Sequence, residues 1–451
     1  MSRSRIDRAG PDDVLNLAVD RGRVPFHIAA LLVLDDRVPA EIVRTMVAER
    51  AGAVPRLASR LHRPAPGGGR PVWVSVAAAE VDRVVGVRGV PLAGDGPAAD
   101  PAEPAFLRAA EDLVLTRFDR SGPLWRAEVL ARPDGAAAAL VVVAHHVLAD
   151  GLAGMAVLGA LADGPSRLPT AEGGGGRRPG QGPVAARVPG WRELAADAWR
   201  ERLTTLRATR DRAGRLRSGM HSLGGGRPRL AEPSSLLARG SSRRRFDVAR
   251  CELSRLHEAA RAQGATVNDL VVASVADAVG RLVRSRGEHL AELVVSVPVS
   301  ARSGGEAADL GNAVGAVPVR VPLHGGDDER VRVLVAAHDA LRGHRPGSTA
   351  SVLTPVMRGL AAVGVFQAAV DRQRLVHTFV TNVRGPATAL TVARSAVREV
   401  VPVATNPGNV TVSFDALSYD GSLVVTVVSD PRHVPEAPRL AADLEAVLRH
   451  W

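Results

Sequence analysis

Along the first third of the chain, short apolar runs alternate with apolar residues spaced three or four positions apart. This pattern predicts strands alternating with helices. The predicted strands cover residues 26–34, 71–76, 124–131 and 137–146, and the predicted helices cover residues 41–50, 104–117 and 152–163.

The same kind of pattern returns in the second half of the chain and ends in a helix that reaches His450. Strands alternating with helices in both halves predict an α/β fold with mixed sheets. The other predicted strands cover residues 247–253, 293–299, 313–323, 376–381, 389–400, 409–416 and 422–428, and the other helices cover residues 254–263, 266–286, 328–342 and 352–372.

A stretch rich in Gly and Pro at residues 164–189 is the best linker in the chain, because little in it can pack. Residues 191–216 then place apolar side chains on a helical period with arginines between them. This basic amphipathic helix has two interpretations. It attaches the protein to an anionic membrane or lipid-droplet surface, or it is a linker helix that packs its apolar stripe on a domain.

A chain of 451 residues exceeds what one hydrophobic core usually organises, so two domains are expected. We place an N-terminal domain at residues 1–163, the linker and basic helix at 164–245, and a C-terminal domain at 246–451.

The net charge of +11 favours anionic partners, namely nucleic acid, a membrane surface or a phosphate-bearing ligand such as coenzyme A. A nucleic-acid partner is not expected, because no basic face interleaved with aromatic residues is visible. The sequence contains no Lys, which excludes Schiff-base and P-loop chemistry.

A single cysteine, Cys251, rules out an internal disulfide and a multi-Cys zinc site, and it favours a reducing cytoplasm. The longest apolar runs fall short of the ~20 residues that span a bilayer. We therefore expect a cytoplasmic protein, either free or peripheral on the inner face of the plasma membrane.

The segment from His145 to Gly151, His-His-Val-Leu-Ala-Asp-Gly, joins an apolar strand to a helix. Adjacent strand residues point to opposite faces, so only one of His145 and His146 can face a given cavity. A neutral imidazole at that position can accept a proton from a hydroxyl group at physiological pH. The segment therefore predicts one catalytic and one structural histidine.

Other interpretations of this segment stay open. Asp150 either caps the helix that begins at Gly151 or pairs with an Arg to brace the loop, or it orients a histidine as in a triad. The histidines themselves fit a buried, hydrogen-bonded pair, and less well a metal site, since no third ligand is evident. A serine nucleophile is disfavoured because no Gly-x-Ser-x-Gly segment is present.

The same segment resembles the HHxxxDG signature of the wax ester synthase/diacylglycerol acyltransferase family. Pro123-Leu124-Trp125 resembles the family's PLW segment, and Asn268-Asp269 resembles its ND motif. Segments around Asn312, from Thr381 and from Ala416 follow in the family's order, so the resemblance covers nearly the whole chain. Two positions depart from it: Arg384 stands where Pro is usual, and Gly86 where His is often seen.

The resemblance implies two chloramphenicol-acetyltransferase-like domains that form a pseudo-dimer with a tunnel at their interface. It also implies an O-acyltransferase that moves a fatty acyl group from acyl-CoA to diacylglycerol or a long-chain alcohol. Acyl-CoA would be a co-substrate, with no permanently bound cofactor and no metal. The alternatives are a condensation-type enzyme that uses a carrier-protein thioester and a non-catalytic lipid-binding protein.

The resemblance also assigns roles to individual residues. His146 would be the general base and His145 its supporting neighbour, with Asp150 and Gly151 holding the loop. Asn382 would either donate to the oxyanion or brace its own loop. Pro123, Leu124 and Trp125 would shape the acyl channel, and Asn268, Asp269 and Asn312 would brace the domain interface, with plain packing an equal alternative for the PLW and ND residues.

Overall fold

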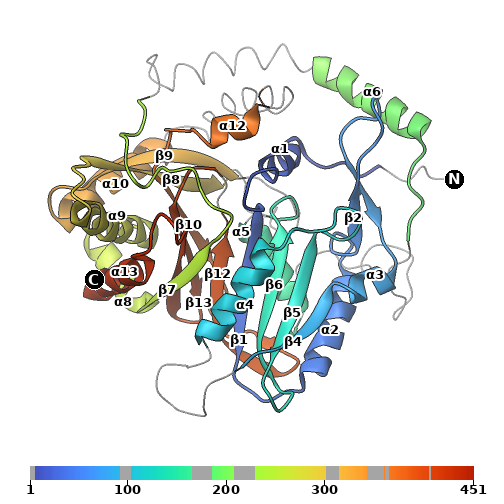
Figure 1. Cartoon of the computed structure of the whole chain (residues 1–451), viewed down its shortest axis with the longest axis horizontal. Helices are drawn as coiled ribbons and strands as arrows, with labels where there is room; N and C mark the ends of the chain where they lie inside the picture. Colours follow the sequence, from blue (N-terminus) through green and yellow to red (C-terminus); the bar gives the residue numbers. More distant parts are fainter. Residues whose placement is uncertain are drawn as a thin grey trace.

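The computed structural model describes residues 6–91, 103–149, 151–164, 185–207, 229–300, 314–342, 360, 365–405 and 408–451. Its strands form two six-stranded sheets and one two-stranded sheet, with helices packed around them (Figure 1). In the described part of the chain, no helix is long and apolar enough to cross a membrane.

The first sheet has the strand order β11-β12-β1-β6-β5-β4. All its neighbouring pairs are antiparallel except β4 and β5. Its strands are β1 (His27–Leu34), β4 (Val85–Gly89), β5 (Trp125–Ala131), β6 (Ala137–His145), β11 (Thr391–Val392) and β12 (Ser395–Ala404), and its helices are α2 (Ala40–Ala53), α4 (Glu103–Leu115) and α5 (Gly151–Leu161).

Strand β6 is buried along its whole length because both of its faces are covered. Val141 and Val143 pack in the cluster that holds Leu113 of α4. Leu140 and Val142 point the other way, into the cluster that holds residues of α2 and α5. This alternation decides which side each following histidine can reach.

The second sheet has the order β7-β14-β13-β10-β8-β9, with β10 parallel to both of its neighbours. Helices α9 and α13 pack together and share its main apolar cluster. The strands are β7 (Arg245–Glu252), β8 (Glu292–Ser300), β9 (Val314–Pro322), β10 (Thr378–Arg384), β13 (Val412–Tyr419) and β14 (Ser422–Ser429), and the helices are α8 (Leu253–Ala262), α9 (Val267–Ser285), α10 (Asp327–Arg342) and α13 (Ala437–His450).

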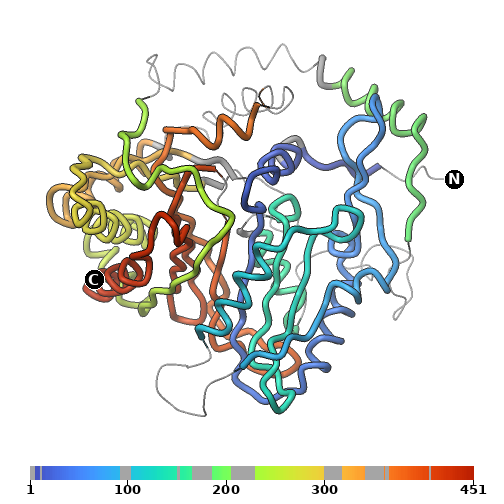
Figure 2. Tube along the Cα trace, in the orientation of Figure 1, coloured from blue at the N-terminus to red at the C-terminus, as the bar shows by residue number. Residues whose placement is uncertain are grey.

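The two sheets are linked by strand exchange. Strand β12 lies late in the chain, yet it pairs with β1 in the first sheet, with Ala404 opposite Ile28. Figure 2 shows this orange segment beside the blue start of the chain. A strand's apolar pattern does not identify its pairing partner, so the sequence-based division at residue 246 does not reveal that the first sheet is completed from the C-terminal part.

Several smaller elements complete the fold, and some of them escaped prediction. The predicted strand at 389–400 is wrong as one strand, because Ala393 and Arg394 adopt positive φ angles of 50° and 67° in a turn between β11 and β12. Neither is a usual turn residue, so the pattern carried no turn signal.

The other elements are α1 (Pro11–Val19), β2 (Ser59–His62), β3 (Val72–Ser75), α3 (Ala78–Asp82), α6 (Trp191–Arg207) and α12 (Phe366–Val370). The sequence pattern did not predict α1, β2 and α3, nor the strand β4 of the first sheet.

Candidate active site

A cavity of about 390 Å³ lies where the two sheets meet. This volume is within the range of small-molecule sites. One wall comes from β12, β1 and β6 of the first sheet together with α5, and the other wall comes from β10 and β13 of the second sheet. Most of the lining is aliphatic, and the polar side chains on it are His146, Thr381, Asn382, Arg384 and Asp415.

His146 lies on this cavity wall immediately after β6. It follows Val142 and Ala144, which line the same wall. Its backbone N–H donates to the Phe26 carbonyl at 3.0 Å, and its ring stacks on the Phe26 ring at 4.4 Å with an angle of 16° between the planes. The imidazole is half-buried: it lines the cavity, and the Phe26 ring packs against one of its faces.

His145 points the other way, as the strand alternation predicts. It is 1% exposed, and its Nδ1 accepts the Val147 backbone N–H at 3.0 Å. The ring proton therefore belongs on Nε2, which lies 3.5 Å from the Asp20 carboxylate. That separation is long for a hydrogen bond, so the contact is mainly electrostatic. His145 thus supports the structure behind the cavity rather than lining it.

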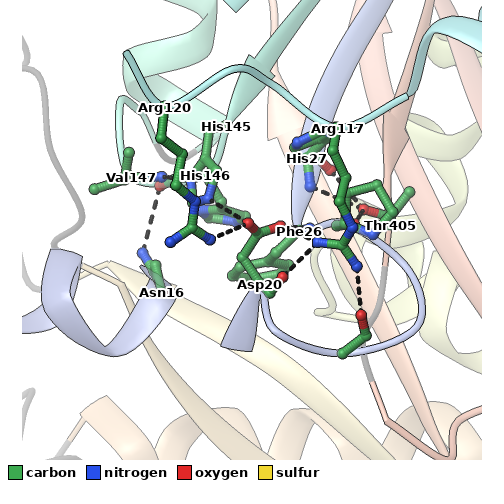
Figure 3. A network of polar contacts seen from close by, with 12 residues as sticks. Asn16, Asp20, Phe26, His27, Arg117, Arg120, His145, His146, Val147 and Thr405 are labelled. Carbon is green, nitrogen blue, oxygen red and sulfur yellow. Dashed lines mark hydrogen bonds and ion pairs between the residues drawn. The ribbon is translucent and has the colours of Figure 1, made fainter. Parts of the chain in front are cut away.

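Asp20 is the centre of a buried polar network behind the two histidines (Figure 3). Its carboxylate accepts the Phe26 N–H at 2.9 Å and pairs with Arg120 at 2.6 Å and with Arg117 at 3.4 Å. Burial alone would raise the pKa of Asp20, but His145, the Phe26 amide and Arg120 lower that pKa well below its usual range. Asp20 therefore stays ionised and holds in place Phe26, on which His146 rests.

His27 extends this network away from the cavity. It lies opposite His145 in the β1–β6 register, and its Nδ1 donates to the Val114 carbonyl at 2.8 Å. Burial lowers the pKa of His27 to about 3, so the ring is neutral at physiological pH. A neutral ring here adds no positive charge next to His145.

Asp415 is the polar feature of the opposite wall. It is 2% exposed, and it accepts hydrogen bonds from Thr381 Oγ1 at 2.8 Å and from the Ala404 backbone N–H at 2.7 Å. Burial raises the pKa of Asp415 to about 7, although both hydrogen bonds lower it. Since Ala404 belongs to β12 and Asp415 to β13, this carboxyl group joins the two sheets at the cavity.

Residues 10–271 match the wax ester synthase/diacylglycerol acyltransferase catalytic domain, and residues 310–450 match the C-terminal domain of the same family. The chain belongs to the wax ester synthase/diacylglycerol acyltransferase family. It is therefore an acyltransferase, and the predicted family and enzyme class are confirmed.

Relatives of this acyltransferase are found among mycobacterial proteins. A probable diacylglycerol O-acyltransferase of Mycobacterium tuberculosis is 26% identical over 442 residues, which covers 95% of this chain and 91% of the relative. A putative diacylglycerol O-acyltransferase of the same species is 29% identical over 399 residues, covering 78% and 75%.

Solved structures share the fold. The wax ester synthase/diacylglycerol acyltransferase from Marinobacter aquaeolei superposes with a TM-score of 0.65 at 19% identity, covering 98% of each chain. The first condensation domain of the calcium-dependent antibiotic synthetase gives 0.59 at 18% identity, covering 99% of this chain and 97% of that one. The predicted mixed α/β fold of the chloramphenicol-acetyltransferase type is thus confirmed.

Of the other residues predicted for the acyltransferase site, two lie on or beside the cavity. Asn382 is half-buried and lines it, from β10. Gly151 is the first residue of α5, the helix that carries further lining residues. Asp150 and Asn312 lie outside the described residues.

The residues of the PLW segment lie behind the cavity wall. Leu124 and Trp125 are each 1% exposed in the core, and Pro123 is buried. The Trp125 indole N–H donates to the carbonyl of Leu57 at 2.8 Å, and Leu57 does line the cavity. This segment contacts the wall from behind, so any effect on the acyl channel would be indirect.

The ND motif lies in the first turn of α9. Asp269 is 4% exposed and forms a capping box with Thr266 at the start of α9, with its Oδ2 3.6 Å from His338 Nδ1. Asn268 is its half-buried neighbour in the first turn. The main contacts of α9 are with α8, α10, α13, β8 and β9, and the capping box stabilises the start of this helix. A role of the motif at the domain interface stays a prediction.

Replacing Asp415 with Asn should change how stability depends on pH. A carboxyl group with a folded pKa near 7 and an unfolded pKa of about 3.9 binds more protons in the folded state, so its contribution falls as pH rises between those values. The unfolding free energy of the native protein relative to Asp415→Asn should fall by on the order of 2 kcal/mol from pH 5 to pH 8.

Asp430→Asn is the matched control for this measurement. Asp430 is 0% exposed, but its pKa is lowered by hydrogen bonds from Ser241 and Arg432 and by the Arg244 charge against the effect of burial. Asp430 is therefore ionised in both the folded and the unfolded state across that range. The difference in unfolding free energy between the native protein and Asp430→Asn should therefore stay the same from pH 5 to pH 8. Equal pH dependence for the two variants in denaturant titrations would contradict the role given to Asp415.

Proposed function

We propose that the chain transfers a fatty acyl group from acyl-CoA to the hydroxyl of diacylglycerol or a long-chain alcohol, with His146 as the general base. The observation that carries this proposal is the half-buried imidazole on the wall of an otherwise aliphatic cavity between two sheets. Such a cavity accommodates an alkyl chain and limits the access of water that would compete with the alcohol.

In this proposal the acceptor hydroxyl gives its proton to the imidazole of His146 as its oxygen attacks the thioester carbonyl. The carbon–sulfur bond then breaks, and the coenzyme A thiolate takes the proton back from the imidazolium. The products are one ester and one free thiol, and no covalent acyl-enzyme forms. Asn382, which lines the cavity, donates its amide N–H to the negatively charged carbonyl oxygen of the intermediate.

The donor in this scheme is a co-substrate, so the protein needs no permanently bound cofactor. Its net charge of +11 favours the phosphates of coenzyme A, and Arg384 contributes an exposed guanidinium at the cavity. Because the acceptor is a lipid, we also propose peripheral contact with a lipid surface.

Turnover with purified full-length protein tests the proposal. Palmitoyl-CoA with hexadecanol, and palmitoyl-CoA with a diacylglycerol, should each be tried for ester formation, because the proposal includes both acceptors. Acylation from a loaded carrier protein with none from acyl-CoA would favour the condensation-type reaction instead. Binding of both lipids without any product would favour a non-catalytic lipid-binding protein.

Narrowing the cavity at Gly154 should change acyl-chain preference. Gly154 lies on α5 and lines the cavity, and a Cβ atom there would have Ile28 Cδ1 at 3.6 Å as an ordinary contact. The Gly154→Leu side chain would extend beyond that contact and occupy space that an acyl chain needs. We expect kcat/KM for palmitoyl-CoA to fall about tenfold relative to that for butyryl-CoA.

Gly159→Leu provides the matched control on the same helix. A Cβ atom at Gly159 meets no atom within 4 Å, and Gly159 does not line the cavity. Both substitutions remove a helical glycine, so both share its effect on helix stability. Two results would show that Gly154 does not border the acyl chain. One is an equal loss of kcat/KM with palmitoyl-CoA and butyryl-CoA in Gly154→Leu, and the other is the same change of acyl-chain preference in Gly154→Leu and Gly159→Leu.

A further inference from the structure

Helix α6 exposes several large apolar side chains to solvent. Trp191 is 55% exposed, Trp199 is 61% exposed and Leu203 is 41% exposed. At 3.6 residues per turn, these three positions lie within roughly a third of the helix circumference. Figure 1 shows α6 at the edge of the molecule, next to β2.

The opposite side of α6 attaches it to the protein. Leu194 and Ala198 are buried at 2%, and Leu194 packs with Val72 and Val74 of β3. This apolar contact fixes which side of the helix faces outward.

The acidic residues of α6 have partners away from the exposed apolar side chains. Asp197 pairs with Arg8 at 2.7 Å, and Glu201 pairs with Arg8 and Arg70. Glu193, the acid in the first turn, accepts the Gly190 backbone N–H at 2.8 Å. None of the described acids of the helix therefore lies among the exposed apolar side chains.

Arginines take the place of acids on the outward side. Arg192 and Arg202 are exposed there, between the two tryptophans and Leu203 around the helix. We call the five side chains Trp191, Arg192, Trp199, Arg202 and Leu203 the outward face of α6.

We propose that the outward face of α6 docks on the headgroup layer of an anionic phospholipid bilayer. Tryptophan is suited to the boundary between headgroups and acyl chains, and arginines beside it attract anionic lipids. A second copy of the chain is a poorer occupant, because a symmetric contact would place these arginines against each other. The inference rests on the proposed function in one respect: docking would hold the enzyme at the membrane that contains its water-insoluble acceptor.

Flotation of the full-length protein with vesicles tests this proposal without any turnover. Vesicles of phosphatidylcholine alone are compared with vesicles that also contain phosphatidylglycerol. Trp199→Ala/Leu203→Ala and Arg192→Gln/Arg202→Gln should each bind the anionic vesicles about tenfold more weakly than the native protein. The arginine variant should also lose most of the salt sensitivity of binding.

Matched controls change equally exposed residues elsewhere. Ile42→Ala/Val87→Ala removes apolar side chains that are 55% and 37% exposed, and Arg255→Gln/Arg439→Gln removes arginines that are 64% and 80% exposed. Both controls should bind like the native protein. All four variants should keep native turnover of a short acyl-CoA with a water-soluble alcohol, since none of the changed residues lines the cavity.

Three results would overturn the docking proposal: unchanged vesicle binding in both α6 variants, equal binding of the native protein to neutral and anionic vesicles, or loss of a dimer in sedimentation when the outward face is changed. Because vesicle binding is measured without substrate, it can succeed while ester formation fails. The docking proposal and the proposed reaction therefore fail separately.

Discussion

Replacing His146 with alanine is expected to lower kcat/KM for ester formation by ~10²–10⁴-fold, the usual contribution of a well-placed general base. The fold should survive, because the His146 ring is half-buried at a cavity and only one side of it stacks on Phe26. Rates of ester formation, together with a denaturant titration of each variant, measure both effects.

His257→Ala serves as the control for this substitution. His257 is exposed on α8, in the C-terminal part of the chain and away from the cavity lining. It should keep native activity. Full activity in the His146→Ala variant would show that another group removes the acceptor proton.

The second large effect is expected for Asp20→Ala. The substitution removes the carboxylate that pairs with Arg120 and Arg117 and accepts the Phe26 N–H. Breaking a buried ion pair on one side costs ~3–5 kcal/mol, and the partial exposure of both arginines places this case near the lower end. Turnover should also fall, because Phe26 loses the contact that holds it against His146.

Two controls test the role of Asp20: the Asp134→Ala variant, and the pH dependence of the stability lost in Asp20→Ala. Asp134 pairs with Arg37 at 2.8 Å, but both side chains are exposed, so its loss should cost about 0–1 kcal/mol. The lowered folded pKa of Asp20 means that its contribution is complete above about pH 4–5 and shrinks as pH falls further. A difference between native protein and Asp20→Ala that stays the same at pH 7 and pH 3 would contradict the role assigned to this charge.

The sequence predicted the parts of the site that are continuous in the chain. The apolar run of β6 followed by His145 and His146 identified a strand end with one histidine on each side, and the structure places them so. Two-residue periodicity is a local property, so it can be read without knowing the fold.

The other parts of the site depend on contacts between distant segments. Asp20, Phe26 and Arg120 meet behind the histidines, yet nothing in their local sequence marks them as a network. Asp415 lies within a strand that was correctly predicted, but its burial depends on β12, whose place in the first sheet the pattern does not reveal. Long-range pairing therefore limits what the sequence predicts here.

The fold alone does not choose the acyl donor, because this chain resembles both an ester-forming acyltransferase and a condensation domain in its overall structure. The family match supports the ester-forming reaction. The chemical step can distinguish a catalytic His146 from a purely structural one. Direct attack of the acceptor hydroxyl on the thioester requires both His146 and an acceptor.

Pre-steady-state release of coenzyme A thiol, followed with palmitoyl-CoA in the presence and absence of hexadecanol or diacylglycerol, tests direct transfer by His146 most directly. We predict that thiol appears only with a lipid acceptor, in equal amount to the ester, and that the His146→Ala variant loses both signals together. A burst of thiol equal to the enzyme concentration without any acceptor, leaving an acylated protein, would contradict the mechanism.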